Sequence, residues 1–105
     1  MLTKTHRIVE PVSGHRVGLA RYRGTAHVEV GDLASIIPRF MVPGDQVYRF
    51  LTIGGRRFVS VHIARRWAKP WKESHEMGAQ ANTLLRILDW AEPALKEAEA
   101  SNGKA

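Results

Sequence analysis

Two β-rich runs joined by Gly54-Gly55 constrain the fold of this chain more than any other feature. The runs cover residues 47–53 and 56–63, and both are rich in β-branched and aromatic side chains. Two consecutive glycines supply the positive φ angles of a two-residue hairpin turn without steric cost. The sequence therefore predicts an antiparallel hairpin over 47–63 with the two glycines at its tip.

A weaker β signal lies near the N-terminus. Residues 6–12 and 15–23 flank Ser13-Gly14, a turn-forming pair, and together they predict a first hairpin. Pro11 lacks an N–H donor, so the first of these strands is expected at an edge of the sheet.

A strand and a short helix are expected between the two hairpins. Residues 27–30 alternate in the manner of a half-buried strand. Asp32 is then the expected N-cap of a short helix over 33–37. Pro38 is expected to end that helix, because the residue before a proline is disfavoured in the α region.

The hydrophobic period changes from about Ser74 onward. Apolar residues then recur every three or four positions, which predicts an amphipathic helix: Met77, Ala81, Leu84, Leu85, Leu88, Ala91 and Leu95. Pro93 either kinks this helix or starts a second one. The segment before it, 64–71, is a basic connector that begins as a helical turn. The sequence thus predicts one small α+β domain over 1–100, with an antiparallel sheet of hairpins, a short capped helix, a C-terminal helical segment and a disordered tail at 101–105.

Length and composition exclude several classes of protein. The chain has 105 residues and no cysteine, so a disulfide framework, a thiolate metal site and a cysteine nucleophile are all excluded. No apolar stretch approaches the roughly 20 residues needed to span a bilayer, and no signal segment opens the chain. We expect a cytoplasmic protein that does not enter the membrane.

Basic residues are concentrated in the first two thirds of the chain. Residues 1–72 hold thirteen basic and four acidic residues, a net charge of +9, whereas residues 73–105 have a net charge of −3. Eleven of the sixteen basic residues are arginine, which favours bidentate contacts with phosphate. Arginine can also serve merely as a solubilising cation, and this interpretation stays open.

One basic segment is interleaved with tryptophan, a pattern typical of nucleic-acid binding, in which cations hold phosphates and an indole stacks on bases. We therefore predict a nucleic-acid interface made by Arg49, Arg56, Arg57, Arg65, Arg66, Trp67, Lys69 and Lys72. Alternatively, Trp67 and Trp71 anchor the core, since they lie four residues apart on one helical face.

Nothing in the sequence predicts catalysis. The five histidines lack a second ligand at metal-binding spacing, and no serine lies in a glycine-flanked elbow. Ser60 and His62 share the spacing of one strand face, which is more often packing than a catalytic dyad. We expect no enzyme activity, no metal and no cofactor.

The C-terminal helix has an apolar stripe wider than one core face needs. Such a stripe often continues into a partner. We expect a homodimer contact made by Leu84, Ile87, Leu88 and Trp90. The alternative is that the stripe closes over the chain's own sheet, with Pro93 turning Trp90 into the core.

Three features in order resemble the BRO N-terminal domain of phage and viral antirepressor-type proteins. The segment 28–37 resembles the family's strand and Asp-capped helix, 50–61 its hairpin, and 88–95 its closing helix with a tryptophan and a Leu-Pro pair. The resemblance spans residues 16–98. It implies a DNA-associated regulatory domain coupled to a partner-binding segment.

These observations predict a small nucleic-acid-binding regulator, encoded by a phage or mobile element, that prefers DNA to RNA. The alternative function is a protein inhibitor or adaptor whose basic face binds an acidic surface of a host regulatory or defence protein. The two differ in the salt dependence of binding to a random duplex.

Overall fold

The computed structural model describes residues 4–42 and 50–103 of the chain. A five-stranded antiparallel sheet has the order β1-β2-β3-β5-β4. Its strands are β1 (Thr5–Val9), β2 (Arg16–Tyr22), β3 (Thr25–Glu29), β4 (Phe50–Ile53) and β5 (Arg56–Ser60). The predicted small α+β fold is confirmed, and β1 lies at a sheet edge as the Pro11 argument required.

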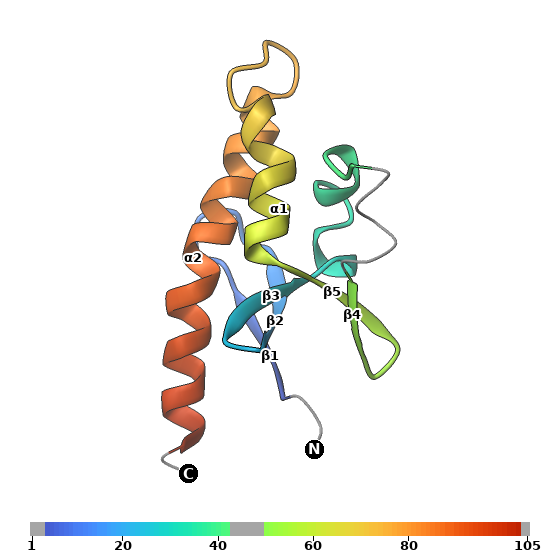
Figure 1. The fold of residues 1–105 in the computed structure, drawn as a ribbon. Helices are drawn as coiled ribbons and strands as arrows, with labels where there is room; N and C mark the ends of the chain where they lie inside the picture. The colour runs from blue at the N-terminus through green and yellow to red at the C-terminus, as the bar shows by residue number, and fades with distance from the viewer. Residues whose placement is uncertain (1–3, 43–49, 104–105) are drawn as a thin grey trace.

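Two helices cover one face of this sheet (Figure 1). They are α1 (Val61–Ala68) and α2 (Gly78–Gly103), with the 3-10 turn η3 (Lys69–Trp71) between them. Val17, Leu19 and Val28 of the sheet form a continuous core with Trp67 of α1 and the buried side of α2. The remaining 3-10 turns, η1 (Gly31–Leu33) and η2 (Ile37–Arg39), connect β3 toward the β4–β5 hairpin.

The predicted Gly54-Gly55 hairpin is confirmed where the structure describes it. Gly54 and Gly55 have φ angles of 57° and 80°, which a type I′ turn requires. Arg56 pairs with Ile53 directly across the turn. Residues 47–49 of the predicted first strand lie outside the described residues.

The second strand of this hairpin is shorter than predicted. It ends at Ser60, and 61–63 begin α1 instead of continuing the strand. The Ser60 hydroxyl accepts a hydrogen bond from the His62 N–H at 3.0 Å, so Ser60 is the N-cap of this helix. The proposed sharing of one strand face by Ser60 and His62 is therefore wrong.

The short helix after β3 also differs from its prediction. Two 3-10 turns replace one α-helix, and Pro38 lies inside η2 instead of ending a helix. Asp32 does not cap either turn. Its carboxylate accepts a hydrogen bond from the Gly18 N–H at 2.7 Å and pairs with Arg7, because it lies over the face of the sheet opposite the helices.

The C-terminal apolar pattern forms one helix of 26 residues, with Pro93 in its interior. The alternative in which Pro93 starts a second helix is therefore wrong. The helix also includes 101–103, which the sequence assigned to the tail, because each residue added to an existing helix gains a hydrogen bond without a new nucleation step.

Glu10 organises the turn between β1 and β2. Its side chain is 2% exposed and accepts hydrogen bonds from the Val12 N–H, the Ser13 N–H and the Ser13 hydroxyl at 2.6–3.0 Å. Burial acts to raise the pKa of Glu10, but these hydrogen bonds and the nearby Arg86 charge lower it below its ordinary value.

This carboxylate makes stability depend on pH. The unfolded chain binds the proton of Glu10 more tightly than the folded chain, so its stabilisation is complete above about pH 4.3 and is lost as pH falls through the folded-state pKa. We expect Glu10→Gln to lower the free energy of unfolding by about 1–2 kcal/mol at neutral pH. Urea unfolding between about pH 6 and pH 3 should show a weaker acid dependence for the variant. Parallel profiles for the two proteins would contradict this role.

Candidate nucleic-acid interface

The helix α1 separates its apolar residues from its basic residues. Val61, Ala64, Trp67 and Ala68 follow a spacing of three and four and are buried, whereas Arg66 is exposed and Arg65 is half-buried. Lys69 continues the helical rotation of Arg65 at a spacing of four residues. Because the Ser60 cap determines where α1 begins, it also determines which side of the helix carries the basic side chains.

Three of the predicted interface residues converge on one hollow between the helices. Arg65, Lys69 and Lys72 line it from α1, η3 and the turn that follows. Across from them, α2 contributes Asn82, Leu85 and Asp89. The hollow has a volume of about 350 Å³, at the small end of the roughly 300–1,000 Å³ that is usual for small-ligand sites.

The backbone near Lys72 is held against the start of α2. The Asn82 Nδ2 donates a hydrogen bond to the Lys72 carbonyl at 3.2 Å. A Cβ at Gly78 would lie only 2.9 Å from the same carbonyl oxygen, so a glycine is needed for this close approach. The segment that carries Lys69 and Lys72 is thus fixed relative to α2.

The charge of the hollow is positive. Among the described residues, three cations and a single carboxylate line it; the carboxylate is that of Asp89, which pairs with Arg65 at 3.0 Å. The Asp89 side chain is 72% exposed, so water screens this pair and its contribution is small. A phosphate can therefore compete with Asp89 for the Arg65 guanidinium, while Lys69 and Lys72 add further positive charge.

The hairpin arginines are used differently from one another. The Arg56 Nε donates to Glu29 at 2.8 Å and its Nη2 contacts the same carboxylate, a bidentate pair that raises the pKa of Arg56. Arg57 is exposed, with its guanidinium 4.8 Å from the centre of the Phe50 ring. Arg56 therefore has a structural role in linking β5 to β3, whereas the Arg57 side chain faces solvent. Arg49 lies outside the described residues.

Trp67 is a core residue. Its side chain is 1% exposed, and its ring packs against Phe50 at a centroid distance of 6.5 Å. It cannot stack on a base without leaving the core, so the predicted binding role of Trp67 is wrong. Trp71, in contrast, is 45% exposed and lies 6.5 Å from the Phe40 ring.

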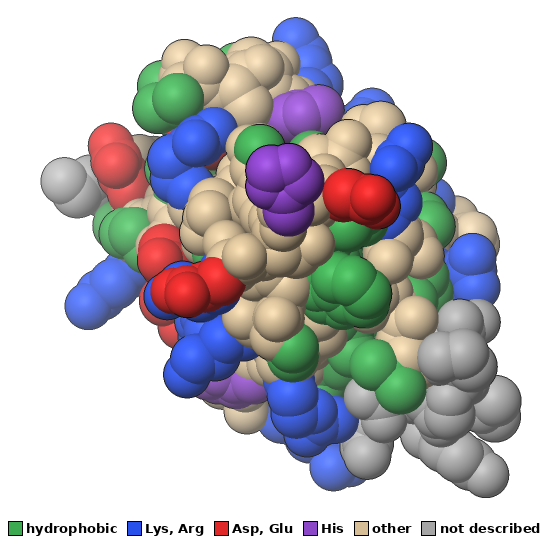
Figure 2. Space-filling model, turned by 90° about the horizontal axis from the view of Figure 1, so that it is seen from above, with side chains coloured by type: hydrophobic (Ala, Val, Ile, Leu, Met, Phe, Trp, Pro, Cys, Tyr) green, Lys and Arg blue, Asp and Glu red, His purple; other side chains and the backbone are tan. Residues whose placement is uncertain are grey.

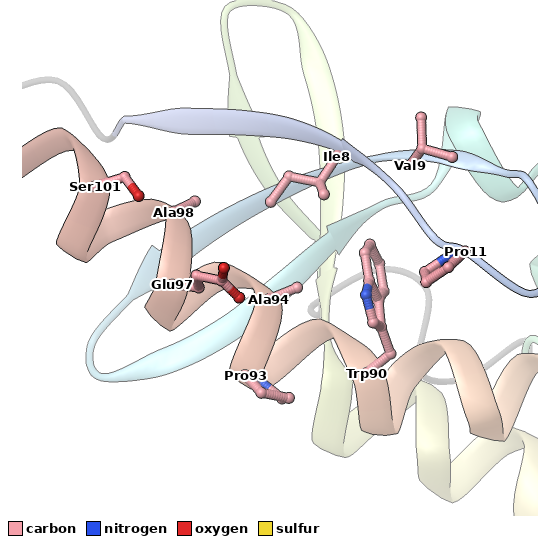
Figure 3. Close-up of a pocket in the computed structure, with 9 residues that line it drawn as sticks. All are labelled: Ile8, Val9, Pro11, Trp90, Pro93, Ala94, Glu97, Ala98 and Ser101. Carbon is pink, nitrogen blue, oxygen red and sulfur yellow. The ribbon is translucent and has the colours of Figure 1, made fainter.

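Most of the predicted dimer contact is also core. Leu84, Ile87 and Leu88 are fully buried against the chain's own sheet and α1, because the apolar stripe of α2 faces both. They cannot reach a second copy in the folded chain. Trp90 is half-buried and lines a groove between α2 and β1 (Figure 3).

An ionic cluster on the sheet face opposite the helices was not foreseen from the sequence. Glu29 and Asp32 lie together over Gly18, and Arg56 and Arg7 pair with them from the two sides. Burial acts to raise the pKa of Asp32, but the Arg7 guanidinium and the Gly18 N–H lower it overall. This cluster links β1, β3 and β5, which are far apart in the sequence.

The remaining basic side chains are not gathered into one patch on the face shown in Figure 2. On the face seen in Figure 2, Lys and Arg side chains lie at many points around the outline, whereas most of the visible Asp and Glu side chains lie on the side of α2. Residues 4–42 and 50–103 contain no group of His, Asp and Glu arranged to hold a metal ion. Nor does any helix within these ranges have the length and apolar character of a membrane span.

Comparisons of the chain with protein-family models, with curated proteins and with solved structures give no match. The resemblance to the BRO N-terminal domain therefore stays a prediction.

Proposed function

We propose that this protein is a non-enzymatic nucleic-acid-binding regulator that holds backbone phosphate in the hollow between α1, η3 and α2. The observation that carries the proposal is the convergence of Arg65, Lys69 and Lys72 on one side of a concave surface. Cations held around a concavity raise the local potential more than the same charges spread over a convex surface.

Duplex DNA is the ligand we propose. Its phosphates are regularly spaced, so a protein that holds one of them in the hollow can place other exposed cations near its neighbours. Contacts of this kind position a protein without reading sequence. The BRO resemblance adds the expectation of a phage-type, DNA-associated regulator.

Neutralising the two lysines tests the proposal. We expect Lys69→Gln/Lys72→Gln to weaken binding to random duplexes of different sequence by a similar factor. Each phosphate contact contributes about −0.9 to the slope of log K against log salt, so losing two contacts should reduce the slope by about 1.8. Fluorescence anisotropy with a labelled duplex over a salt series measures both quantities.

Lys96→Gln is the matched control, because Lys96 is an exposed lysine on the acidic part of α2. A single such control should leave the salt slope close to that of the wild-type protein. A loss from this single-charge control of about half that of the double variant would show that only net charge matters and would contradict the role of the hollow. Absence of duplex binding at low salt would instead favour the inhibitor function, in which the basic surface binds an acidic protein.

A further inference from the structure

The strand β1 presents its outer edge to solvent. It is the last strand of the sheet, and among the described residues it pairs only with β2. The Glu10 N–H donates to the His15 carbonyl at 2.8 Å across this pair. Backbone groups alternate in direction along an antiparallel strand. The N–H and C=O groups of Thr5, Arg7 and Val9 therefore point outward from the sheet.

Within residues 4–42 and 50–103, this edge lacks the usual protection against pairing. Exposed edges are commonly blocked by free charges, by prolines or by a covering segment. Here Arg7 is drawn onto the sheet face by Asp32, Pro11 lies beyond the end of the strand, and Val9 is 48% exposed. A second strand can therefore approach along the full length of β1.

An apolar groove of about 400 Å³ runs beside the same edge. Ile8 of β1 points into it toward Trp90 and Ala94 of α2, whereas Val9 points away from α2 (Figure 3). Ala98 and Ser101 continue the α2 side of the groove at helical spacing, and their small side chains leave room for another chain. The backbone edge and the groove thus form one continuous surface.

We propose that a second copy of this chain occupies this surface, with the two β1 strands paired antiparallel so that Ile8 of one copy faces Ile8 of the other. The two sheets then form one ten-stranded sheet with a two-fold axis at Ile8. This inference is independent of the proposed nucleic-acid function.

The register follows from the charges on the strand. Hydrogen bonds between two β1 strands require their outward residues to face each other. A register centred on Arg7 would place two guanidinium groups opposite each other, which is destabilising. A register centred on Ile8 places each Arg7 opposite a Val9 and brings the two Ile8 side chains together at a closely spaced pair. The edge is therefore complementary to itself in this register, which favours a second copy as the occupant.

Introduced thiols test both the dimer and its register, because the wild-type chain has no cysteine. Two Cβ atoms at a two-fold-related, closely spaced pair lie within reach of a disulfide. We expect Ile8→Cys to form a covalent dimer under mild oxidation, and Val9→Cys, which leaves Arg7 in place, to stay largely monomeric. Non-reducing electrophoresis compares the two. Preferred cross-linking of Val9→Cys would overturn the register, and no cross-linking of either variant would overturn the edge contact.

A proline at the edge tests the contact without a thiol. Val9→Pro removes one outward N–H but none that bonds to β2, so the chain should fold and the dimer should be weaker, with dissociation already at concentrations where the wild type stays dimeric. Val9→Thr keeps the N–H and is the matched control. Sedimentation equilibrium should show a dimer for wild type and Val9→Thr, and a mass near 11.8 kDa for Val9→Pro. A wild-type protein that stays at that mass up to high micromolar concentration would refute the proposal.

Discussion

Replacing Trp67 with alanine is expected to lower the free energy of unfolding by about 3–5 kcal/mol, the usual cost of truncating a fully buried tryptophan. The indole is 1% exposed and lies between α1, the sheet and Phe50. Its removal leaves a cavity, because a packed core relaxes only partly around a deleted side chain. Urea denaturation followed by circular dichroism measures the loss.

Trp71→Ala is the matched control for this experiment. Its ring is 45% exposed, so its truncation should cost only about 1 kcal/mol. Trp67→Phe should retain most of the stability, since a smaller aromatic ring still fills much of the site. If Trp67→Ala were as stable as wild type but no longer bound nucleic acid, the indole would be a binding residue after all.

A methyl group at Gly18 should be the second most damaging change. A Cβ there would lie 2.5 Å from the Glu29 Oε1 and 3.1 Å from the Asp32 Oδ2. Both carboxylates are held in place by arginines, so neither can move without weakening an ion pair. We expect Gly18→Ala to lower the free energy of unfolding by about 1–3 kcal/mol, as measured by urea denaturation.

A double-mutant cycle separates this collision from a general effect of alanine in β2. In a Glu29→Ala background the closest atom is gone, so Gly18→Ala should cost clearly less than it does in the wild-type protein. Equal costs in the two backgrounds would show that the carboxylates do not limit the size of residue 18.

The parts of the fold that depend on local chemistry could be predicted from the sequence. Gly54-Gly55 determines its turn because few other residues adopt two successive positive φ angles, and Pro11 indicates an edge because it lacks a donor. The apolar period of α2 likewise predicts its buried face. These signals act within a few residues, so no tertiary information is needed to interpret them.

The start of α1 could not be predicted by strand propensity alone. Val61, His62 and Ile63 continue a β-rich run, and the deciding feature is the Ser60 side chain that caps the helix. The spacing of Val61, Ala64, Trp67 and Ala68 was the available signal, and it would have placed Trp67 in the core. Tertiary packing against α2 then outweighs the β propensity of these residues.

The candidate site could be predicted only in part from the sequence, because it too depends on tertiary contacts. Basic residues could be counted, but which of them remain available depends on partners distant in the chain. Glu29 neutralises Arg56 from 27 residues away, whereas Lys69 and Lys72 keep their positions in the hollow with Arg65. Counting arginine doublets therefore overestimates how many cations of the hairpin are available to a ligand. It underestimates the contribution of the two lysines that follow α1.

The proline inside α2 divides that helix into two parts of unequal resistance to opening. Pro93 has no N–H to donate, so the helical hydrogen bond to the Asp89 carbonyl is absent. Arg21 of β2 donates hydrogen bonds of 2.9–3.1 Å to Glu92, just before the proline, and to Glu99, two helical turns later. The Arg21 side chain thus connects the C-terminal part of α2 to the sheet. Local unfolding of that end therefore breaks the Arg21–Glu99 ion pair together with the packing of Leu95, which is fully buried beyond the proline.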